Sequence, residues 1–158
     1  MINPIQIKLN DLNANNISHR MRIINGGDNY KLIGLSHKIS EAENINWLDG
    51  YEKDSSKKLF VITYGEKPCG LIGLTKINQS AGSANLFIVN DGRYKNKGIG
   101  SRAMDLVITY AKNKYGITSI FLTVKDKNTV AIDFYKKLGF KEIKNNPLEN
   151  ELEFVLNI

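Results

Sequence analysis

The stretch "SANLFIVNDGRYKNKGIGSRAM" (residues 83–104) passes from an apolar segment through a glycine-containing loop into a helical pattern. Its last fourteen residues, 91–104, hold four positively charged side chains and three glycines. A strand that leads into Gly98, Ile99 and Gly100 and then into a helix leaves the first N–H groups of that helix unpaired, and their dipoles favour an anion. The stretch therefore predicts a phosphate-binding turn, although an ordinary turn with solvated lysines would fit the loop taken alone.

The spacing of the glycines argues against two common nucleotide sites. A P-loop has four residues between its glycines, followed by Lys and then Ser or Thr, and this loop lacks that pattern. A dinucleotide-binding fingerprint has a further small residue where Ala103 stands, but it opens the first βαβ unit of a domain. Here three antiparallel strands are expected before the loop, so ATP and NAD are disfavoured as ligands.

Apolar alternation on both sides of the loop predicts a mixed sheet. Period-two patterns separated by turn residues predict an antiparallel meander of strands at 57–64, 69–77 and 83–90. The segments before the meander are predicted as a strand at 5–9, a helix at 11–24 and an irregular segment at 25–36. Further strands are predicted at 119–124, 141–143 and 151–156.

Capping residues and apolar stripes predict the remaining helices. Ser40, with Glu43 three residues later, forms a capping-box pattern for a short helix that contains Trp47. After the glycine loop, apolar residues recur at spacings of three and four from Ala103 to Tyr115, which indicates a helix with one buried face. Interleaved strands and helices of this kind indicate an α/β fold in which helices cover both faces of the sheet.

A last helix is predicted in "NTVAIDFYKKLGF" (residues 128–140). Gly139 is placed to end it in a left-handed cap. The apolar residues of one helical stripe, which we expect to be buried, are Val130, Ala131, Phe134, Tyr135 and Leu138.

Length and composition set the limits for the functional assignment. A chain of 158 residues with 42% hydrophobic content predicts one domain over residues 1–158. Because Cys69 is the single cysteine, we expect a reducing compartment, no disulfide and no metal site. No apolar run approaches the ~20 residues that span a bilayer, so we expect a cytoplasmic protein without a membrane partner. The net charge of +6 is scattered, and the glycines within its one dense cluster favour a small phosphate ligand over nucleic acid.

Two segments together resemble the GNAT family of acetyl-CoA-dependent N-acetyltransferases. "ANLFIVNDGRYKNKGIG" (residues 84–100) is similar to the family's fourth strand and its (Gln/Arg)-x-x-Gly-x-(Gly/Ala) loop, with Lys95 in place of the usual Gln or Arg. "NTVAIDFYKKLGF" is similar to the motif that follows in the family. The resemblance implies a single-domain α/β fold, with a mixed, mostly antiparallel sheet of about six to seven strands flanked by about four helices.

The resemblance also implies how acetyl-CoA binds. The pyrophosphate is expected on backbone N–H groups of the glycine loop and the helix start, and the pantetheine arm on the main chain of a fourth strand that bulges and splays from the fifth. Asn128 is expected to hydrogen-bond the same arm. The cofactor-binding residues implied in this way are Ile88, Val89, Asn90, Lys95, Asn96, Lys97, Gly98, Ile99, Gly100, Ser101, Arg102 and Asn128.

The implied reaction is attack of an unprotonated amine on the thioester carbonyl. Tyr135, seven residues after Asn128, is expected to donate a proton to the departing thiolate, although a core aromatic would fit the same apolar stripe. The positions where relatives carry a basic carboxylate hold Asn85 and Thr123, which cannot act as carboxylate bases. Candidates for the base are Glu41, Glu43, Asp126 or a water chain, while His19 and His37 are expected at the surface.

The acceptor pocket is expected between residues 23–51 and 144–151. "RIIN" followed by "HKISEAENINWL" resembles a branch that acetylates protein N-termini and nucleotide-linked amino sugars, which favours a small polar amine such as an amino sugar. The alternatives are a protein N-terminus, an aminoglycoside, or a protein that binds acetyl-CoA without turnover. A monomer and a homodimer are both compatible with the sequence.

Overall fold

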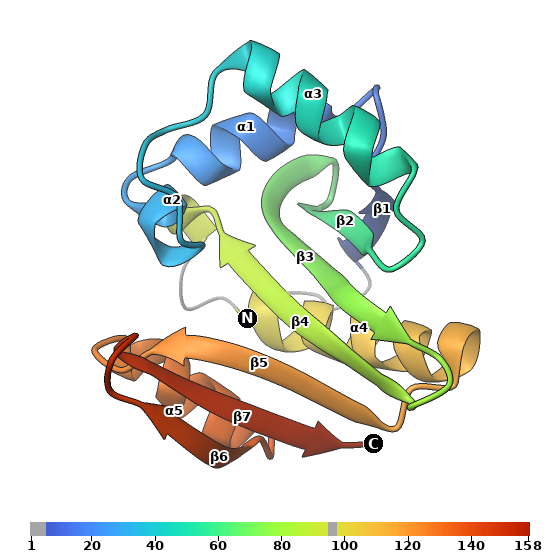
Figure 1. Ribbon diagram of the computed structural model, residues 1–158. Helices are drawn as coiled ribbons and strands as arrows, with labels where there is room; N and C mark the ends of the chain where they lie inside the picture. Colours follow the sequence, from blue (N-terminus) through green and yellow to red (C-terminus); the bar gives the residue numbers. More distant parts are fainter. Residues whose placement is uncertain (1–5, 95–97) are drawn as a thin grey trace.

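The computed structural model describes residues 6–94 and 98–158 and shows a seven-stranded sheet (Figure 1). The strand order is β1-β2-β3-β4-β5-β7-β6. Only the β4 and β5 pair is parallel. The expected mixed, mostly antiparallel sheet is therefore confirmed, with five α-helices in place of about four.

The N-terminal part departs from the predicted boundaries. Strand β1 is described from Ile7 to Asp11 and ends later than predicted, while the predicted first residue, Ile5, lies outside the described residues. Helix α1 covers only Ile17–Asn25. The predicted helix start was wrong because asparagines fold residues 12–16 into turns: the backbone N–H of Asn13 donates to Asn16 Oδ1 at 2.9 Å, and the side chain of Asn16 donates to the carbonyl of Asp11.

The segment predicted as irregular contains the four-residue helix α2, Asn29–Leu32. The next helix, α3, covers Glu41–Glu52 and begins with the predicted capping box. The Glu43 N–H donates to Ser40 Oγ at 3.1 Å, and the Ser40 N–H donates to Glu43 Oε1 at 3.1 Å. Helix α3 therefore starts at the residue that the sequence indicates.

The predicted antiparallel meander is confirmed. It consists of β2, Lys58–Tyr64, β3, Lys67–Asn78, and β4, Ser83–Asn90. The pairing of β3 with β4 continues without a shift from Gly70 and Asn90 to Thr75 and Asn85. The expected bulge in β4 was wrong: the one extra residue at the register shift between β3 and β4 lies in β3, where Lys76 takes a positive φ of 49°.

The C-terminal half alternates helices and strands as predicted. Its elements are α4 at Ile99–Tyr115, β5 at Ser119–Lys125, α5 at Thr129–Lys137, β6 at Lys141–Asn146 and β7 at Glu151–Asn157. Gly139, with φ of 97°, follows α5 in the expected left-handed conformation. Val130 was wrongly placed in the buried stripe, because the stripe is rotated towards Ile132, and Val130 is 80% exposed.

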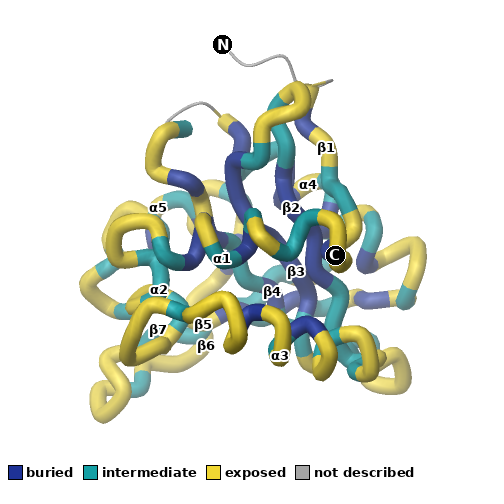
Figure 2. The backbone as a smooth tube through the Cα atoms, turned by 90° about the horizontal axis from the view of Figure 1, so that it is seen from above, coloured by how far each residue is buried: buried dark blue, intermediate teal, exposed yellow. Residues whose placement is uncertain are grey.

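The helices cover the two faces of the sheet unequally. One core packs α4 and α5 on strands β1 to β5 and β7. A second core packs α1 and α3 on β2, β3 and β4 only. Figures 1 and 2 show this division: α1 and α3 lie on one side of the sheet and α4 on the other. In Figure 1, among the described residues, no helix crosses the front of β5, β7 and β6.

The sheet divides between β4 and β5. The parallel ladder joins only residues 83–85 of β4 to residues 119–121 of β5. Beyond Asn85 and Phe121 the two strands diverge, as Figure 1 shows for the strands in yellow-green and orange. The splay expected from the family resemblance is thus present, and it leaves the edge of β4 without a strand partner from Leu86 to Asn90.

Candidate active site

The glycine turn places an uncapped helix start at the end of β4. After the 3-10 turn Gly92–Tyr94, Gly98 takes a left-handed φ of 75° and precedes the first residue of α4 without a side-chain cap. The first helical hydrogen bond runs from the Arg102 N–H to the Gly98 carbonyl at 3.2 Å. The N–H groups of Ile99, Gly100 and Ser101 precede that bond, so they can bind an anion.

Three of the predicted binding residues, Lys95, Asn96 and Lys97, lie outside the described residues. The side chains that the structure does describe at the helix start are those of Ile99, Ser101 and Arg102. Ile99 is buried and anchors the first turn of α4 in the core, while Ser101 and Arg102 are half-buried.

Arg102 supplies an independent indication of an anion. Its Nε is buried and has no hydrogen-bond partner among the described residues. A buried donor without a partner is costly, and a phosphate oxygen near the helix start would satisfy it. The donors at this position therefore fit a phosphorylated ligand such as coenzyme A.

Gly100 is the point at which three predicted segments meet. A Cβ at this position would lie 3.3 Å from Phe134 Cζ of α5 and 3.8 Å from Ile88 Cδ1 of β4. The end of β4, the start of α4 and the middle of α5 thus come together around one residue without a side chain. A glycine allows α5 to approach the helix start closely.

The backbone N–H and C=O groups of β4 point alternately towards β3 and towards the splay. The Asp91 N–H donates to Cys69 of β3 at 2.8 Å, and the Val89 carbonyl points at Gly70 of the same strand. By alternation, the polar backbone groups of Ile88 and Asn90 point away from β3, into the splay. The carbonyl of Asn90 already accepts from the side chain of Asn29 of α2 at 3.1 Å.

Asn128 lies at the start of α5, and Tyr135 lies at the end of its second turn. Asn128 caps this helix: its Oδ1 accepts the Ala131 N–H at 3.3 Å, a bond that does not use its side-chain amide hydrogens. The ring of Tyr135 is buried between Phe134 and Phe140, with ring centroids 5.5 Å and 5.7 Å away. The core-aromatic and functional interpretations of Tyr135 are therefore compatible with each other.

Burial sets the protonation state of Tyr135. Desolvation raises the pKa of its phenol to about 12, because the phenolate would lie in an apolar core. At neutral pH the hydroxyl keeps its proton, so Tyr135 can donate a proton and cannot serve as the base.

Asp91 joins the two sides of the site. It is buried, and its Oδ2 accepts from Arg22 of α1 and from Arg93, both at 2.8 Å. The hydrogen bond from Arg93, followed by that from Arg22, holds the pKa of Asp91 well below its usual range. Asp91 is therefore a permanent anion that fixes the residues before the glycine turn to helix α1.

A pocket of about 320 Å³ opens beside this ion pair. It is lined by Arg22, Ile23, Gly26, Asn29, Asp91, Gly92 and Arg93. Sequence reasoning missed these residues as a group, since Arg22 and Asp91 are 69 positions apart and no local pattern links them. The one available signal was the position of Asp91 directly after a strand and before the glycine turn.

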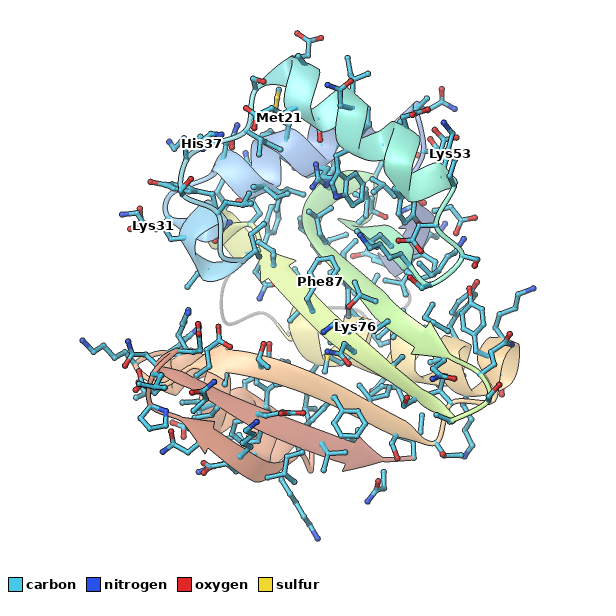
Figure 3. The ribbon with its side chains drawn as sticks, viewed as in Figure 1. Met21, Lys31, His37, Lys53, Lys76 and Phe87 are labelled. Carbon is cyan, nitrogen blue, oxygen red and sulfur yellow. The ribbon has the colours of Figure 1, made fainter. Side chains whose placement is uncertain are left out.

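The open face of the sheet places four further side chains near the splay. On the side of α1 and α3, Asn85 pairs with Phe121 in the last register of the parallel ladder. One row further, Phe87 of β4, labelled in Figure 3, and Thr123 of β5 follow on the same face, because side chains alternate along a strand. The cross-strand neighbour of Thr123 is Glu153 of β7, which is half-buried.

The groups predicted as possible bases lie apart from this row. Glu43 is used by the capping box, and its Oε2 contacts His37 Nε2 at 3.0 Å on the exposed segment before α3. Hydrogen bonds from His37 and Ser40 lower the pKa of Glu43. Glu41 is exposed in the first turn of α3, and Asp126 is exposed in the turn after β5.

Trp47 packs in the second core rather than at the splay. Its ring stacks on Tyr51 at 5.1 Å, and the buried guanidinium of Arg20 lies 3.6 Å from the Trp47 ring centroid. The guanidinium donates to Asn44 Oδ1 at 2.7 Å, which joins α1 to α3. Trp47 therefore packs α3 on the sheet.

The chain belongs to the GNAT family of acetyltransferases, which use acetyl-CoA. The family's sequence model, described as "Acetyltransferase (GNAT) family", matches residues 28–140. This range contains the glycine turn, the splay and the whole of α5.

Among individual proteins, the spermidine N(1)-acetyltransferase of Escherichia coli (strain K12) is 32% identical over 114 residues, which cover 69% of this chain and 58% of the relative. The chain thus aligns with little more than half the length of that relative. The crystal structure of spermidine N-acetyltransferase from Vibrio cholerae in complex with CoA and spermine matches with a TM-score of 0.90 at 19% identity, over 97% of this chain and 96% of that chain.

The crystal structure of Campylobacter jejuni N-acetyltransferase PseH in complex with acetyl coenzyme A matches with a TM-score of 0.76 at 21% identity, over 96% of this chain and 98% of that chain. At these low identities the two crystal structures establish the shared fold.

In the described part of the chain, no helix combines the length and apolar character needed to cross a bilayer. The same residues contain no group of His, Cys, Asp and Glu side chains that could hold a metal ion.

Proposed function

We propose that this protein transfers the acetyl group of acetyl-CoA to a small polar primary amine. The observation that carries the proposal is the meeting of the splayed β4 edge, the uncapped start of α4 and the α5 tyrosine around Gly100. The unpartnered Nε of Arg102 supports a phosphate at the same position. Family membership supports acetyl-CoA as the donor.

The described residues divide the binding of the donor between main chain and side chains. The N–H groups of Ile99, Gly100 and Ser101 and the Arg102 guanidinium receive the pyrophosphate. The main chain of Ile88 and Asn90, on the free edge of β4, pairs with the pantetheine arm in the manner of an added strand. Val89 pairs with β3 and so holds this edge of β4 in position for the cofactor.

The side chains at the splay serve the transfer itself. The amine attacks the thioester carbonyl, a C–N bond forms, and the C–S bond of the tetrahedral intermediate then breaks. Tyr135, which carries its proton at neutral pH because burial raises its pKa to about 12, donates this proton to the leaving thiolate. The side-chain amide of Asn128 contacts the pantetheine arm.

Two acceptor classes follow from different observations. The 32% identical relative is named for spermidine, which favours a polyamine. The segments at 22–25 and 37–48 resemble a branch that acetylates nucleotide-linked amino sugars, and the Arg22 and Arg93 guanidiniums beside the pocket favour an acceptor that carries phosphate. A protein N-terminus and an aminoglycoside complete the set of acceptors to be compared.

The test is release of free thiol from acetyl-CoA with a panel of amines: polyamines, nucleotide-linked and free amino sugars, aminoglycosides and N-terminal peptides. The expected result is release that depends on one class of amine. If acetyl-CoA raises the melting temperature but no amine stimulates release, the protein is a binder without turnover. A melting shift with DNA or RNA but none with acetyl-CoA would reject the proposal altogether.

A further inference from the structure

Acetyl transfer to an amine requires a base that the usual positions do not supply. A free alkyl amine has a pKa near ~10, so at neutral pH most of it carries a proton that must be removed before attack. The side chains that border the splay on the open face are Asn85, Phe87, Phe121 and Thr123. None of them can hold or release a proton at neutral pH.

Glu153 is the carboxylate in the next position of the same row. It is the direct cross-strand partner of Thr123, and both side chains alternate with core residues of their strands, so they share the open face. Side chains paired in this way have Cβ atoms about 4.5 to 5.5 Å apart. Because Glu153 stands one strand away from the short, exposed Thr123, one bridging water can connect its carboxylate to a group bound at the splay.

The charges around Glu153 leave it unpaired. Two residues earlier on β7, Glu151 forms an ion pair with Lys125 of β5 at 3.0 Å. Glu153 forms no ion pair with a described residue, although its cross-strand neighbour on β6 is Lys144 and the next residue on that face of β6 is Lys141. Both lysines therefore lie on the same face as Glu153 without pairing with its carboxylate.

The other ionisable groups near the site either already have hydrogen-bond partners or are protonated at neutral pH, so they cannot act as the base. Asp91 is held by hydrogen bonds from Arg22 and Arg93, which lower its pKa and make it a poor proton acceptor. Tyr135 keeps its proton at neutral pH because of its raised pKa of about 12. His37 and Glu43 contact each other on the exposed segment before α3.

We propose that Glu153 is the general base of the reaction and acts on the acceptor amine through one water molecule above Thr123. The inference rests on the proposed function. Glu153 accepts the first proton of the ammonium, through the water, and later releases it to solvent. The neutral amine then forms the C–N bond as described above. Its second proton replaces the one that Tyr135 gives to the sulfur when the C–S bond breaks, so the products are the amide, coenzyme A thiol and one proton.

The experiment compares wild type with Glu153→Gln on the best amine from the panel. The expected kcat of Glu153→Gln is lower by about 100-fold or more, the usual contribution of a positioned general base. The remaining activity should rise towards alkaline pH, because only amine that has lost its proton in solution can then attack. The melting shift caused by acetyl-CoA should stay unchanged.

Two further variants control for structural effects. Glu142→Gln removes the same charge from the neighbouring strand β6, where Glu142 is exposed and pairs with Phe154 on the opposite face, and it should keep the wild-type kcat. In the second, Thr123→Glu is added to Glu153→Gln. It places a carboxylate directly at the border of the splay and should restore most of the lost kcat.

The outcomes separate the two proposals. A wild-type protein that releases no thiol with any amine rejects the proposed function, and the role of Glu153 falls with it. A wild type that turns over while Glu153→Gln has the same kcat and pH profile rejects the role of Glu153 alone. Loss of the acetyl-CoA melting shift in Glu153→Gln, without rescue by Thr123→Glu, identifies a structural defect and also overturns the role.

Discussion

In the proposed function, the donor side and the acceptor side of the site use different parts of the chain. The donor side consists largely of main chain: a free strand edge at Ile88 and Asn90 and an uncapped helix start after Gly98. The acceptor side consists of side chains on an open sheet face and of the segment between α1 and α3. Main-chain binding limits the sequence at a few glycines, whereas side-chain binding can change with every substitution. This difference explains why the donor is readable from the sequence and the acceptor is not.

Replacement of Tyr135 should give the largest effect on the donor side. Tyr135→Phe keeps the ring between Phe134 and Phe140 and removes only the hydroxyl, so kcat should fall by about 100-fold or more while the acetyl-CoA melting shift is kept. The measurement is steady-state thiol release. Tyr64→Phe, another tyrosine against the same core, is the control and should leave kcat unchanged. Equal rates for Tyr135→Phe and wild type would assign the thiolate's proton to solvent.

The ion pair that joins the two sides should matter for stability. Asp91→Asn should lower the free energy of unfolding at pH 7 by about 2 kcal/mol, because charged hydrogen bonds from Arg22 and Arg93 are lost. The pKa of Asp91 is lowered in the folded state, so its stabilisation is complete above the ordinary carboxyl pKa of about 3.9 and is lost as the pH falls towards the folded value.

Urea unfolding at pH 7 and pH 3 measures this effect. The difference between wild type and Asp91→Asn should be smaller at pH 3. Asp49→Asn, which removes an exposed partner of Lys53, serves as the control and should change the free energy by less than about 0.5 kcal/mol. A difference for Asp91→Asn that does not depend on pH would show that the carboxyl group is not held as an anion.

A matched pair of glycine substitutions tests the close approach at the helix start. Gly50 of α3 has open space around its missing Cβ, so Gly50→Ala should stabilise the protein by about 0.5 to 1 kcal/mol. Gly100→Ala places a Cβ 3.3 Å from Phe134 Cζ and should instead weaken acetyl-CoA binding by about tenfold, equivalent to about 1.4 kcal/mol. Titration calorimetry gives the affinities. Unchanged binding in Gly100→Ala would separate α5 from the donor site.

The smallest effect is expected on the acceptor side, at His37. This side chain is exposed, and its hydrogen bonds to described residues are those with Ser36 and Glu43, so His37→Asn should leave kcat close to the wild-type value. Thiol release with saturating amine measures it. A large fall in kcat would move the base from β7 to the segment before α3 and would therefore contradict the role of Glu153 as well.

The fold was largely predictable where each element carries its own local pattern. The capping box of Ser40 and Glu43, the meander of β2 to β4 and the helix after Gly98 all depend on residues close in sequence. The start of α1 was not predictable, because five residues of asparagine-rich turn have the same apolar spacing as a helix. Val130 was misplaced because the apolar spacing of α5 fits two helical faces, and the buried face is the one that contains Ile132.

The candidate site was predictable in the same uneven way. The glycine turn and Tyr135 were identified because both belong to short patterns. Glu153 was not, because its importance depends on the register of β7 against β5, and the sequence does not state which residue faces Thr123. Asp91 and Arg22 likewise meet only through the packing of α1 on β4.

The three-residue contact between residues 83–85 and 119–121 has a mechanical consequence. It divides the sheet into two parts that are joined by this short ladder: strands β1 to β4 form one part, and β5, β7 and β6 form the other. The angle between the two parts can change without breaking the backbone hydrogen bonds inside either part. Acetyl-CoA bound between the two parts would hold them together. We therefore expect the angle between the parts to vary in the free protein and to be fixed in the complex.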